Sequence, residues 1–387
     1  MARLGDVCTI VSGTTPKSSR PEYWDGDINW VTPAELNDDS DIVYESQRKI
    51  TKQAVVDTSL KSFPAGTVLL SSRAPIGKVA IAGTEMFCNQ GFKNLICSDV
   101  IYNRYLYHFL KNKTEYLNSL GRGATFKEIS KSIVEEIEIP LPPLEEQRCI
   151  AALLDKVSDL IAKRRAQLDK LDLLVKARFV EMFGDPESNP MNWPIVEIGA
   201  VTKTIDSGWS GNGKQREKKS GEIAVLKVSA VTKGYFIPEE CKVLADQESI
   251  KKYVFPQKGD LLFSRANTKE MVGATAIIKE DYPDLILPDK LWKIRFSDAT
   301  NVVYMKYILS SKTIRNKFSA VSTGTSGSMY NVSMEKFKAI QIPMPEISIQ
   351  NQFASFTGNV ENARLTIQQS LDKLEILKKA LIQECFT

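Results

Sequence analysis

The side chains that most often carry out catalysis or bind metal ions are few in this sequence and lie far apart. The 387 residues include one histidine, His108, inside the stretch Tyr-Leu-Tyr-His-Phe-Leu at 105–110, and no partner of catalytic type stands near it. We interpret His108 as a packed or capping residue and not as a general base. The six cysteines contain no C-x-x-C pair, which argues against a zinc site and indicates reduced, mostly buried thiols.

Three short motifs come close to those of enzymes. Residues 208–214 fit the phosphate-loop pattern G-x-x-x-x-G-K, but Gln215 stands where a Ser or Thr must contact magnesium. The Asn-Pro-Met-Asn sequence at 189–192 lacks the Pro-Pro-aromatic ending of an amino-methyltransferase motif. The Pro-Asp pairs at 283–284 and 288–289 are typical of turns and are not followed by a nuclease-like Glu-x-Lys. We therefore predict no catalytic residue, no metal site and no cofactor site, and a chain that is not an enzyme.

Composition permits a nucleic-acid partner without requiring one. The chain is 43% hydrophobic and 25% charged, with a net charge of +4. Two stretches, 104–131 and 214–219, concentrate basic residues next to Gly, Ser, Thr or Asn, a combination that suits phosphate contacts. Each stretch alone is equally compatible with an ordinary solvated loop. No apolar run is long enough to span a membrane, and the start lacks a signal pattern, so we expect a cytoplasmic protein.

The elements that must position these residues are arranged in an internal repeat. The segments 4–13, 66–73, 139–142 and 168–171 recur, in the same order, at 198–208, 259–265, 342–345 and 371–374. The number of residues between the two copies is the same for the last two pairs of segments and varies among the earlier pairs. A constant separation indicates an element kept without insertions or deletions, whereas the part of each copy before it was free to change in length.

The constant part is predicted to be a long helix in each copy. Pro142 and Pro143, followed by two glutamates, give a helix start, and Gly184 gives a stop. Each helix should contain about forty residues, a length of about 60 Å. Apolar residues alternate at steps of four and three, as in a coiled coil. The first seam is interrupted by two arginines and reads Ile150, Leu154, Val157, Ile161, Arg164, Leu168, Leu171, Val175, Arg178 and Met182. The second seam reads Ile349, Phe353, Phe356, Val360, Ala363, Ile367, Ser370, Leu374, Leu377 and Leu381.

The fold class that follows is α+β: two mixed α/β heads related by the internal repeat and joined by two long antiparallel coiled-coil helices. Short apolar strands separated by Gly, Pro and polar loops fill both heads. We place the first head at 1–143, the first helix at 144–184, a linker at 185–194, the second head at 195–345 and the second helix at 346–387.

Several motifs give the chain a family resemblance over essentially its whole length. They include Gly-Thr-Thr-Pro at 13–16, Pro-Glu-Tyr-Trp at 21–24, Leu-Ser-Ser-Arg-Ala-Pro-Ile-Gly at 70–77, Asn-Gln-Gly-Phe-Lys at 89–93, Ala-Thr-Phe-Lys-Glu-Ile-Ser at 124–130 and Ile-Pro-Leu-Pro-Pro-Leu-Glu-Glu-Gln at 139–147. With the repeat and the long helices, they resemble the specificity (S) subunit of Type I restriction–modification systems. The second head departs from these motifs, since Gly-Thr-Ser-Gly-Ser at 324–328 stands where the first head has Gly-Ala-Thr-Phe-Lys.

The resemblance implies a reader of double-stranded DNA with two target recognition domains, one for each half of a bipartite target. It implies two methyltransferase (M) subunits docked along the helices, with S-adenosylmethionine bound in those subunits, and possible restriction (R) subunits. Antiparallel pairing of the repeats agrees with this division of labour, because a pseudo-twofold turns both heads toward one side of a duplex.

Candidate DNA-binding residues are the Arg, Lys, Asn, Gln, Ser, Thr and Tyr side chains at loop ends. Arg can contact guanine with two hydrogen bonds, Asn or Gln can contact adenine, and Lys and hydroxyl groups hold phosphate. In the first head they are Lys17, Ser18, Arg20, Arg73, Lys78, Gln90, Lys93, Arg122, Thr125 and Lys127. In the second head they are Lys214, Arg216, Lys233, Arg265, Asn267, Lys269, Lys290, Thr325, Ser326 and Tyr330. Trp24 and Trp30 are interpreted as core residues.

Two other classes of function remain open at this point. One is a non-catalytic adaptor whose helices and heads bind other proteins. The other is a methyltransferase acting alone, which the missing motifs disfavour. Binding to duplex DNA would distinguish a DNA specificity subunit from a protein–protein adaptor. S-adenosylmethionine bound to the isolated chain would favour the methyltransferase.

Overall fold

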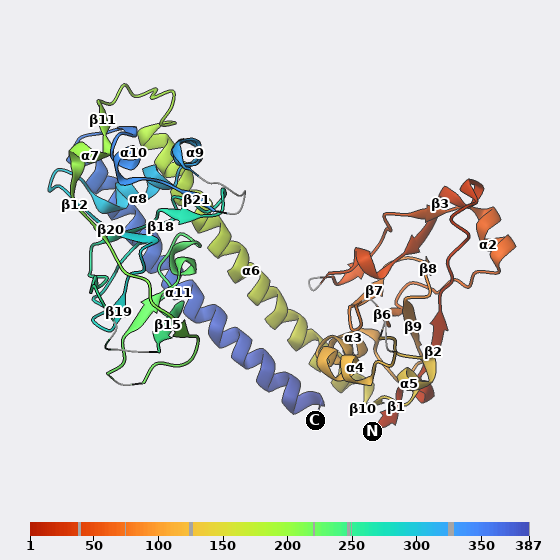
Figure 1. The fold of residues 1–387 in the computed structure, drawn as a ribbon. Coiled ribbons are helices and arrows are strands. Elements are labelled where there is room, and N and C mark those ends of the chain that lie inside the picture. The colour runs from red at the N-terminus through yellow and green to blue at the C-terminus, as the bar shows by residue number, and fades with distance from the viewer. Residues whose placement is uncertain are drawn as a thin grey trace. The chain divides into compact units, whose positions relative to one another are not determined.

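The chain forms two compact units. A computed structural model describes residues 1–37, 40–73, 75–123, 127–219, 221–245, 248, 250–323 and 329–386. Unit 1 comprises Met1–Ala166 and Ile367–Thr387, and unit 2 comprises Gln167–Thr366 (Figure 1). The boundary between the units falls inside the two long helices, so each unit contains part of both.

Unit 1 is a mixed α/β structure built on a five-stranded sheet of order β2-β9-β6-β7-β4 and a small sheet of order β5-β3-β8. Its elements are β1 (Ala2–Arg3), α1 (Leu4–Val7), β2 (Cys8–Ser12), η1 (Pro21–Tyr23), β3 (Trp24–Val31), η2 (Pro33–Glu35), β4 (Ile42–Val43), β5 (Lys49–Ile50), α2 (Lys52–Thr58), β6 (Val68–Ser71), β7 (Val79–Ala82), β8 (Phe87–Cys88), β9 (Phe92–Cys97), α3 (Asn103–Lys111), α4 (Thr114–Leu120), α5 (Lys131–Glu135), β10 (Glu138–Ile139) and the start of α6 (Leu144–Phe183).

Unit 2 repeats this plan with a four-stranded sheet of order β12-β20-β16-β18 and a second sheet of order β13-β15-β14-β19. Its elements are β11 (Ile195–Glu197), α7 (Ile198–Val201), β12 (Thr202–Ser207), β13 (Gly213–Lys214), β14 (Ala224–Leu226), η3 (Val228–Val231), β15 (Cys241–Leu244), β16 (Leu261–Ser264), β17 (Ala266–Asn267), β18 (Thr275–Ile277), β19 (Leu285–Ile286), β20 (Leu291–Phe296), α8 (Val302–Ser310), α9 (Lys312–Val321), β21 (Tyr330–Asn331), α10 (Met334–Lys338), β22 (Gln341–Pro343) and the start of α11 (Ile347–Phe386).

The central strand of each main sheet is apolar on both faces, which explains its uninterrupted run of apolar residues. Side chains alternate across a strand, so neighbouring residues enter different cores. In β6, Val68 and Leu70 pack into one core cluster, while Leu69 packs into another. In β16, Leu261 and Leu262 divide between two clusters in the same way. The equivalent strand order in the two sheets confirms the internal repeat.

The two long helices predicted from the sequence are present. Helices α6 and α11 contain 40 residues each. Gly184 follows α6 with a φ of 73°, a backbone conformation that favours glycine, and its N–H donates to the Val180 carbonyl oxygen at 2.8 Å. Within unit 1 the Arg165 guanidinium lies 2.7 Å from the Glu375 carboxylate, and within unit 2 Arg364 pairs with Asp172. In unit 1 Ile150 also lines a pocket with Cys385, and in unit 2 Phe183 packs against Phe353. In each unit the two contacts run in opposite order along α6 and α11, so the helices are antiparallel and the predicted fold class is confirmed.

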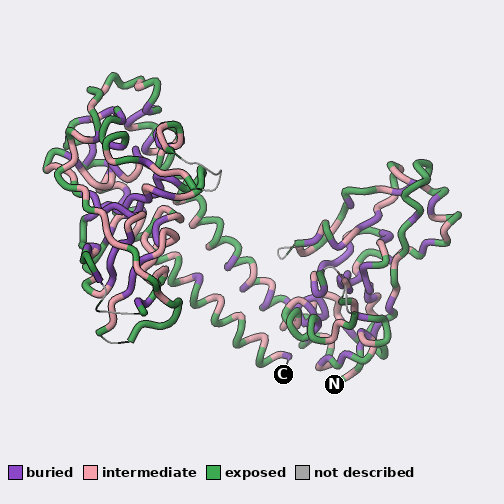
Figure 2. The backbone as a smooth tube through the Cα atoms, viewed as in Figure 1, coloured by how far each residue is buried: buried purple, intermediate pink, exposed green. Residues whose placement is uncertain are grey.

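The predicted seam holds on α6 but not along all of α11. Buried residues recur along both helices (Figure 2), and on α6 even the arginines that interrupt the apolar pattern are half-buried. On α11, however, Ala363 is exposed and Leu377 is 46% exposed, so these two assignments are wrong. Beyond Val360 the seam continues through Arg364 and Leu371. Long basic side chains can cover apolar surface with their methylene stems, and a reading based on apolar residues alone overlooks them.

A buried glutamine fixes each long helix to its head. The Gln147 side chain accepts a hydrogen bond from the Tyr102 N–H at 2.8 Å and donates to the carbonyl oxygens of Val100 and Pro142 at 3.0 and 2.8 Å. In unit 2, Gln350 accepts from the Asn301 N–H at 2.8 Å. Both glutamine side chains belong to residues with 0% exposure. They satisfy backbone groups that the interior would otherwise leave unpaired.

The two units differ in what surrounds this junction. In unit 1, Arg104 donates to both carboxylate oxygens of Asp155 at 2.9 and 2.8 Å and also pairs with Asp41. His108, 3% exposed, lies 2.6 Å from Asp155 through Nε2, which confirms it as a packed residue. Burial lowers the pKa of His108 more than the neighbouring Asp155 raises it. In unit 2, aromatic rings occupy the junction, with Phe179 packed against Tyr304 and other rings.

The cysteines are less buried than predicted. All six are unpaired, but only Cys8 and Cys88 are buried, and Cys149 on α6 is exposed. Among the described residues, no helix is apolar over a length sufficient to cross a bilayer.

Candidate DNA interface

Polar side chains of unit 1 gather at one edge of its main sheet. The C-terminal ends of β2 and β6 and the N-terminal end of β9 meet there, because Ser12 lies opposite Lys93 and Ser71 lies opposite Phe92 in antiparallel pairs. Arg73 follows β6 and Gln90 precedes β9. The β-pairing thus brings together residues that are far apart in the sequence.

Glu128 organises the basic residues of this edge. Its carboxylate lies 3.4 Å from the Arg73 guanidinium and 3.1 Å from the Lys93 ammonium. The Lys93 side chain is only 8% exposed, whereas that of Arg73 is 35% exposed. The Arg73 side chain is therefore accessible to a ligand. The buried Lys93 contributes to the edge through its ion pair with Glu128.

The remaining predicted residues of unit 1 divide into exposed and engaged ones. The exposed members of the predicted set are Lys17, Ser18, Arg20, Gln90, Arg122 and Lys127. Arg20 donates to the Tyr23 hydroxyl at 3.1 Å, and the Thr15 hydroxyl donates to the side-chain amide oxygen of Gln90. The Lys78 ammonium instead donates to the carbonyl oxygens of Pro33, at 3.1 Å, and Leu36. Lys78 thus ties a loop in place. Thr125 lies outside the described residues.

Unit 2 has an equivalent edge with different side chains. Ser207 lies opposite Trp292, and Ser264 lies opposite Leu291. The Arg265 Nε donates to the Asp289 carbonyl oxygen at 2.7 Å, and Ser210 donates to the Asp289 carboxylate. The Ser210–Asp289 pair corresponds to Thr15–Gln90 in unit 1, whereas Arg265 takes the backbone position of Ser72, one residue before that of Arg73.

Four further predicted residues lie at or beside this edge of unit 2. Asn267 and Tyr330 are paired across β17 and β21. The Lys290 carbonyl oxygen accepts from the Arg265 N–H at 3.1 Å, which places Lys290 beside Arg265. Lys269 is exposed two residues beyond Asn267. The edge therefore combines cations, an amide and a phenol, groups that can contact both phosphate and base edges.

Three basic residues predicted for unit 2 lie on other elements. Lys214 is exposed on β13 of the second sheet, and Lys233 is exposed after η3. Arg216 forms a double hydrogen bond with the Glu222 carboxylate at 2.8 and 2.7 Å, which lowers the pKa of Glu222 to about 2. A phosphate would have to displace Glu222 from Arg216. Thr325 and Ser326 lie outside the described residues.

Sequence reasoning missed the two acidic residues that order these edges, Glu128 and Asp289. In the sequence Asp289 fits only an incomplete nuclease motif, and Glu128 lies inside the motif at 124–130, so neither stands out as an organising acid. A signal was present, because each acid stands next to predicted basic residues.

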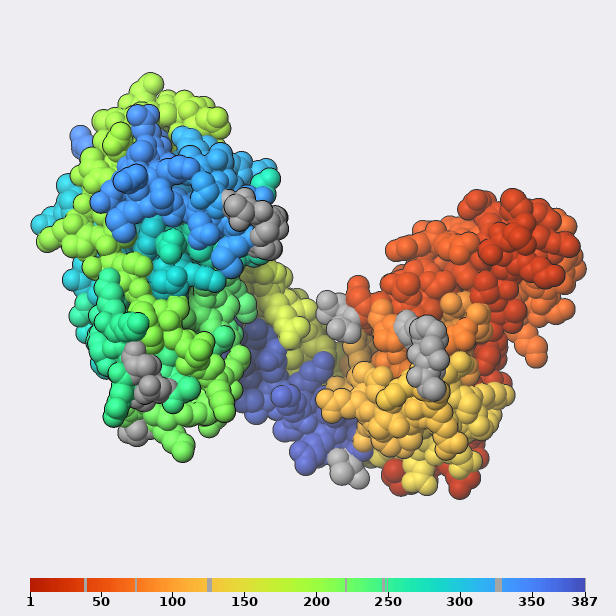
Figure 3. All heavy atoms as spheres, in the orientation of Figure 1, coloured from red at the N-terminus to blue at the C-terminus, as the bar shows by residue number. Residues whose placement is uncertain are grey.

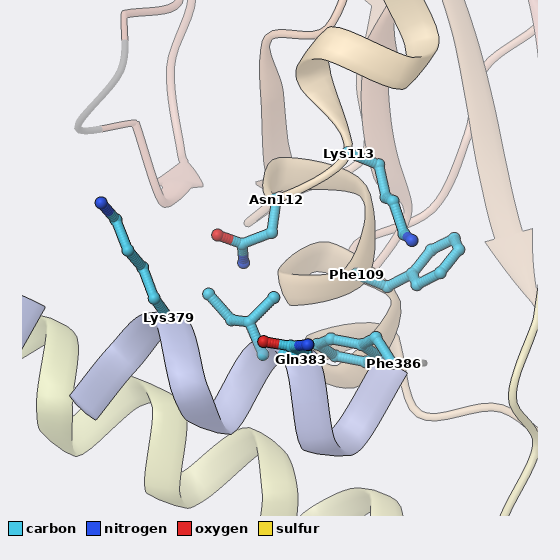
Figure 4. Close-up of a pocket in the computed structure, with 7 residues that line it drawn as sticks. Phe109, Asn112, Lys113, Lys379, Gln383 and Phe386 are labelled. Atoms are coloured by element: carbon cyan, nitrogen blue, oxygen red, sulfur yellow. The ribbon is translucent and has the colours of Figure 1, made fainter. Parts of the chain in front are cut away.

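The described residues offer no cluster of metal ligands, and one cavity of unit 1 has a lining without a carboxylate, an imidazole or a thiol. Among the described residues, no three His, Cys, Asp or Glu side chains are grouped so that they could hold a metal ion. A cavity of about 290 Å³ in unit 1 lies between the α3–α4 junction and the last turns of α11 (Figure 4). Its lining consists of Phe109, Asn112, Lys113, Lys379, Ile382, Gln383 and Phe386. This lining is apolar, amide and cationic, and it contains no carboxylate, imidazole or thiol.

Comparison with known proteins relates both halves of the chain to one family. Residues 1–171 and 190–376 each match the family model described as Type I restriction modification DNA specificity domain. The specificity subunit of the Type I restriction enzyme MjaIX of Methanocaldococcus jannaschii is 36% identical over 271 residues, which cover 65% of this chain and 62% of that relative. The EcoKI specificity subunit of Escherichia coli K12 is 23% identical over 421 residues, which cover all of this chain and 88% of that relative.

Solved structures show the same fold. A chain from a structure of the assembly and conformational transition of a Type I restriction–modification system has a TM-score of 0.61 at 18% identity, and the match covers 99% of this chain and 96% of that one. The S subunit from M. genitalium has a TM-score of 0.57 at 14% identity, with 100% and 95% covered. The two matched repeats, the paired long helices and the full-length structural likeness agree, and the chain therefore belongs to the DNA specificity subunits of Type I restriction–modification systems.

Proposed function

We propose that this specificity subunit recognises a bipartite DNA target, with unit 1 reading one half-site and unit 2 reading the other. The observation that carries the proposal is the occurrence of the same sheet edge in both units with different side chains. Ser71 and Ser264 occupy equivalent places, and an arginine follows each within two residues, Arg73 in unit 1 and Arg265 in unit 2, while the equivalent positions 90 and 289 hold different residues, Gln90 and Asp289. Two half-sites of different sequence require the same backbone arrangement in each unit with different side chains to contact the bases.

The chain itself is proposed to carry out no chemistry and to bind no cofactor. In this proposal two methyltransferase subunits dock on the long helices and supply S-adenosylmethionine, and restriction subunits can join them. Exposed apolar residues at repeat-equivalent positions support two equal docking places: Leu173 on α6 is 63% exposed, and Ile376 on α11 is 67% exposed. Large exposed apolar side chains often mark protein interfaces. Incubation of the purified chain with duplex DNA and labelled S-adenosylmethionine should give no methylated DNA unless a methyltransferase subunit is added.

Selection of bound duplexes from a random pool tests the DNA-reading proposal. The wild-type chain, with its partner subunits, should select two short conserved blocks. Arg73→Ala should relax only one block and Arg265→Ala only the other, each with a loss of about 1–3 kcal/mol if the arginine contacts a base. Selection of no sequence by the wild type would contradict the proposal and would favour a protein–protein adaptor. Equal losses on selected and random duplexes would assign the two arginines to phosphate.

A further inference from the structure

We infer that Arg48, a residue outside the edge described above, reads a guanine in the half-site contacted by unit 1, with its guanidinium held in place by two tryptophans. The inference rests on the proposed function and adds a specificity-determining residue to it. Arg48 precedes β5 and is exposed. The N-terminal part of unit 1, drawn in red and orange in Figure 3, presents this region at the surface.

The guanidinium of Arg48 is backed by aromatic rings. Its carbon lies 3.8 Å from the centroid of the Trp24 ring and 5.5 Å from that of Trp30. The two indoles pack edge to face, with centroids 5.1 Å apart and planes at 80°. The Arg48 backbone is also held, because its carbonyl oxygen accepts from the Ser46 hydroxyl at 2.6 Å. Stacking on an indole orients the guanidinium plane and stabilises the charge.

The donors of Arg48 remain available for a ligand. Among the described residues, no carboxylate forms an ion pair with its guanidinium, in contrast to Arg73 with Glu128 and Arg265 with Asp289. Stacking orders the Arg48 side chain, while the N–H groups at the edge of its guanidinium have no carboxylate partner in the part of the chain that the structure describes. Such an arginine can donate two parallel hydrogen bonds to a ligand and loses little side-chain entropy on binding. Guanine offers the matching pair of acceptors, O6 and N7, in the major groove.

The tryptophans connect Arg48 to the sheet edge. The Trp30 Nε1 donates to the Thr14 carbonyl oxygen at 3.1 Å, and the Trp24 Nε1 donates to the Lys17 carbonyl oxygen at 3.4 Å. The same segment reaches the edge through the hydrogen bond between Thr15 and Gln90. The segment 14–17 therefore links the tryptophans that hold Arg48 to Gln90 at the sheet edge.

The arrangement is particular to unit 1. Its second sheet, β5-β3-β8, supplies both tryptophans, whereas the second sheet of unit 2 is built from different strands. Within the described part of unit 2, no arginine stacks on a tryptophan. Loss of Arg48 should therefore change one half-site and leave the other unchanged.

The test uses the full-length chain with its partner subunits and compares the affinity for a duplex selected by the wild type with that for a random duplex. Arg48→Gln should weaken binding to the selected duplex by about 5- to 150-fold and leave the random duplex nearly unaffected. Arg48→Lys should restore little, because an ammonium cannot form the paired contact. Trp24→Phe should give an intermediate loss. Selection from a random pool should lose the preference for a G at one position of one half-site.

Arg3→Gln is the matched control. It removes one positive charge from β1, which lies with β10 at the end of unit 1 away from β3 and α2 (Figure 1), and it should leave selection unchanged. Thermal unfolding of each variant shows whether unit 1 is intact. Equal losses on selected and random duplexes, or unchanged selection by a folded Arg48→Gln chain, would overturn the inference while the wild-type selection still supports the proposed function. Failure of the wild type to select any sequence would overturn both.

Discussion

Replacement of Gln147 by leucine should destabilise unit 1 because this side chain satisfies three backbone groups in the interior. Leucine has a similar volume and favours helix, so the change removes the hydrogen bonds without leaving a large cavity or weakening α6 itself. The groups that lose a partner are the N–H of Tyr102 and the carbonyl oxygens of Val100 and Pro142.

The size of the effect follows from the surroundings of these three groups. A buried polar group left unpaired costs about 1–3 kcal/mol. Val100 is exposed and Pro142 is half-buried, so water can reach part of the site and reduce the cost. We expect a loss of about 2–4 kcal/mol in the free energy of unfolding. For a unit of this size, that loss corresponds to about 5–15 °C in melting temperature.

Differential scanning calorimetry measures this shift. Gln350→Leu should produce a comparable shift in the transition of unit 2, because Gln350 makes the equivalent contacts there. Gln368→Leu is the control: Gln368 is an exposed glutamine on α11, and its replacement should change stability by less than about 0.5 kcal/mol. A Gln147→Leu chain that melts within 1 °C of the wild type would refute the view that this glutamine fixes the helix to its head.

Two further predictions concern the helices and pH. Leu371→Ala should lower the free energy of unfolding by about 2–4 kcal/mol because Leu371 is 5% exposed in the seam. Leu377→Ala should lower it by less than about 0.5 kcal/mol because Leu377 is 46% exposed. Chemical denaturation measures both losses, and a larger loss for Leu377→Ala would reject the revised seam. Burial lowers the pKa of His108, so the folded chain binds this proton less readily than the unfolded chain does, and stability should fall as the pH drops below about 6.5. Melting curves of His108→Gln between pH 7 and 5 should show a weaker pH dependence, and an unchanged slope would exclude His108 as its source.

The parts of the fold that repeat could be predicted from the sequence, because each copy confirms the other. The helix start after Pro143 and the stop at Gly184 depend on local backbone preferences, which sequence shows directly. The seam of α11 beyond Val360 could not be predicted fully from the pattern of apolar residues. There the side chains of Arg364 and Lys378 are half-buried, and which residues of α11 face α6 depends on the residues of α6 that they pack against.

The candidate interface was only partly predictable for a related reason. Residue type suggested Arg73, Lys78 and Lys93 alike, but their roles depend on long-range pairing. Lys78 meets backbone carbonyl groups more than forty residues away in sequence, and Lys93 is buried by the strands on either side of β9. Nothing in the sequence distinguishes Arg48, because its significance depends on Trp24 and Trp30, which the fold brings to it.

The buried Lys93 has a consequence for how readily the two halves can acquire new targets. In unit 1 a change at Glu128 would leave a charged ammonium without its partner in the interior, so variation at this edge carries a stability penalty. In unit 2 the equivalent strand position holds Trp292, which packs by its ring and needs no counter-ion. Libraries randomised at the unit 2 edge should therefore yield more folded variants, and retargeting by mutation should proceed more easily through the second half-site.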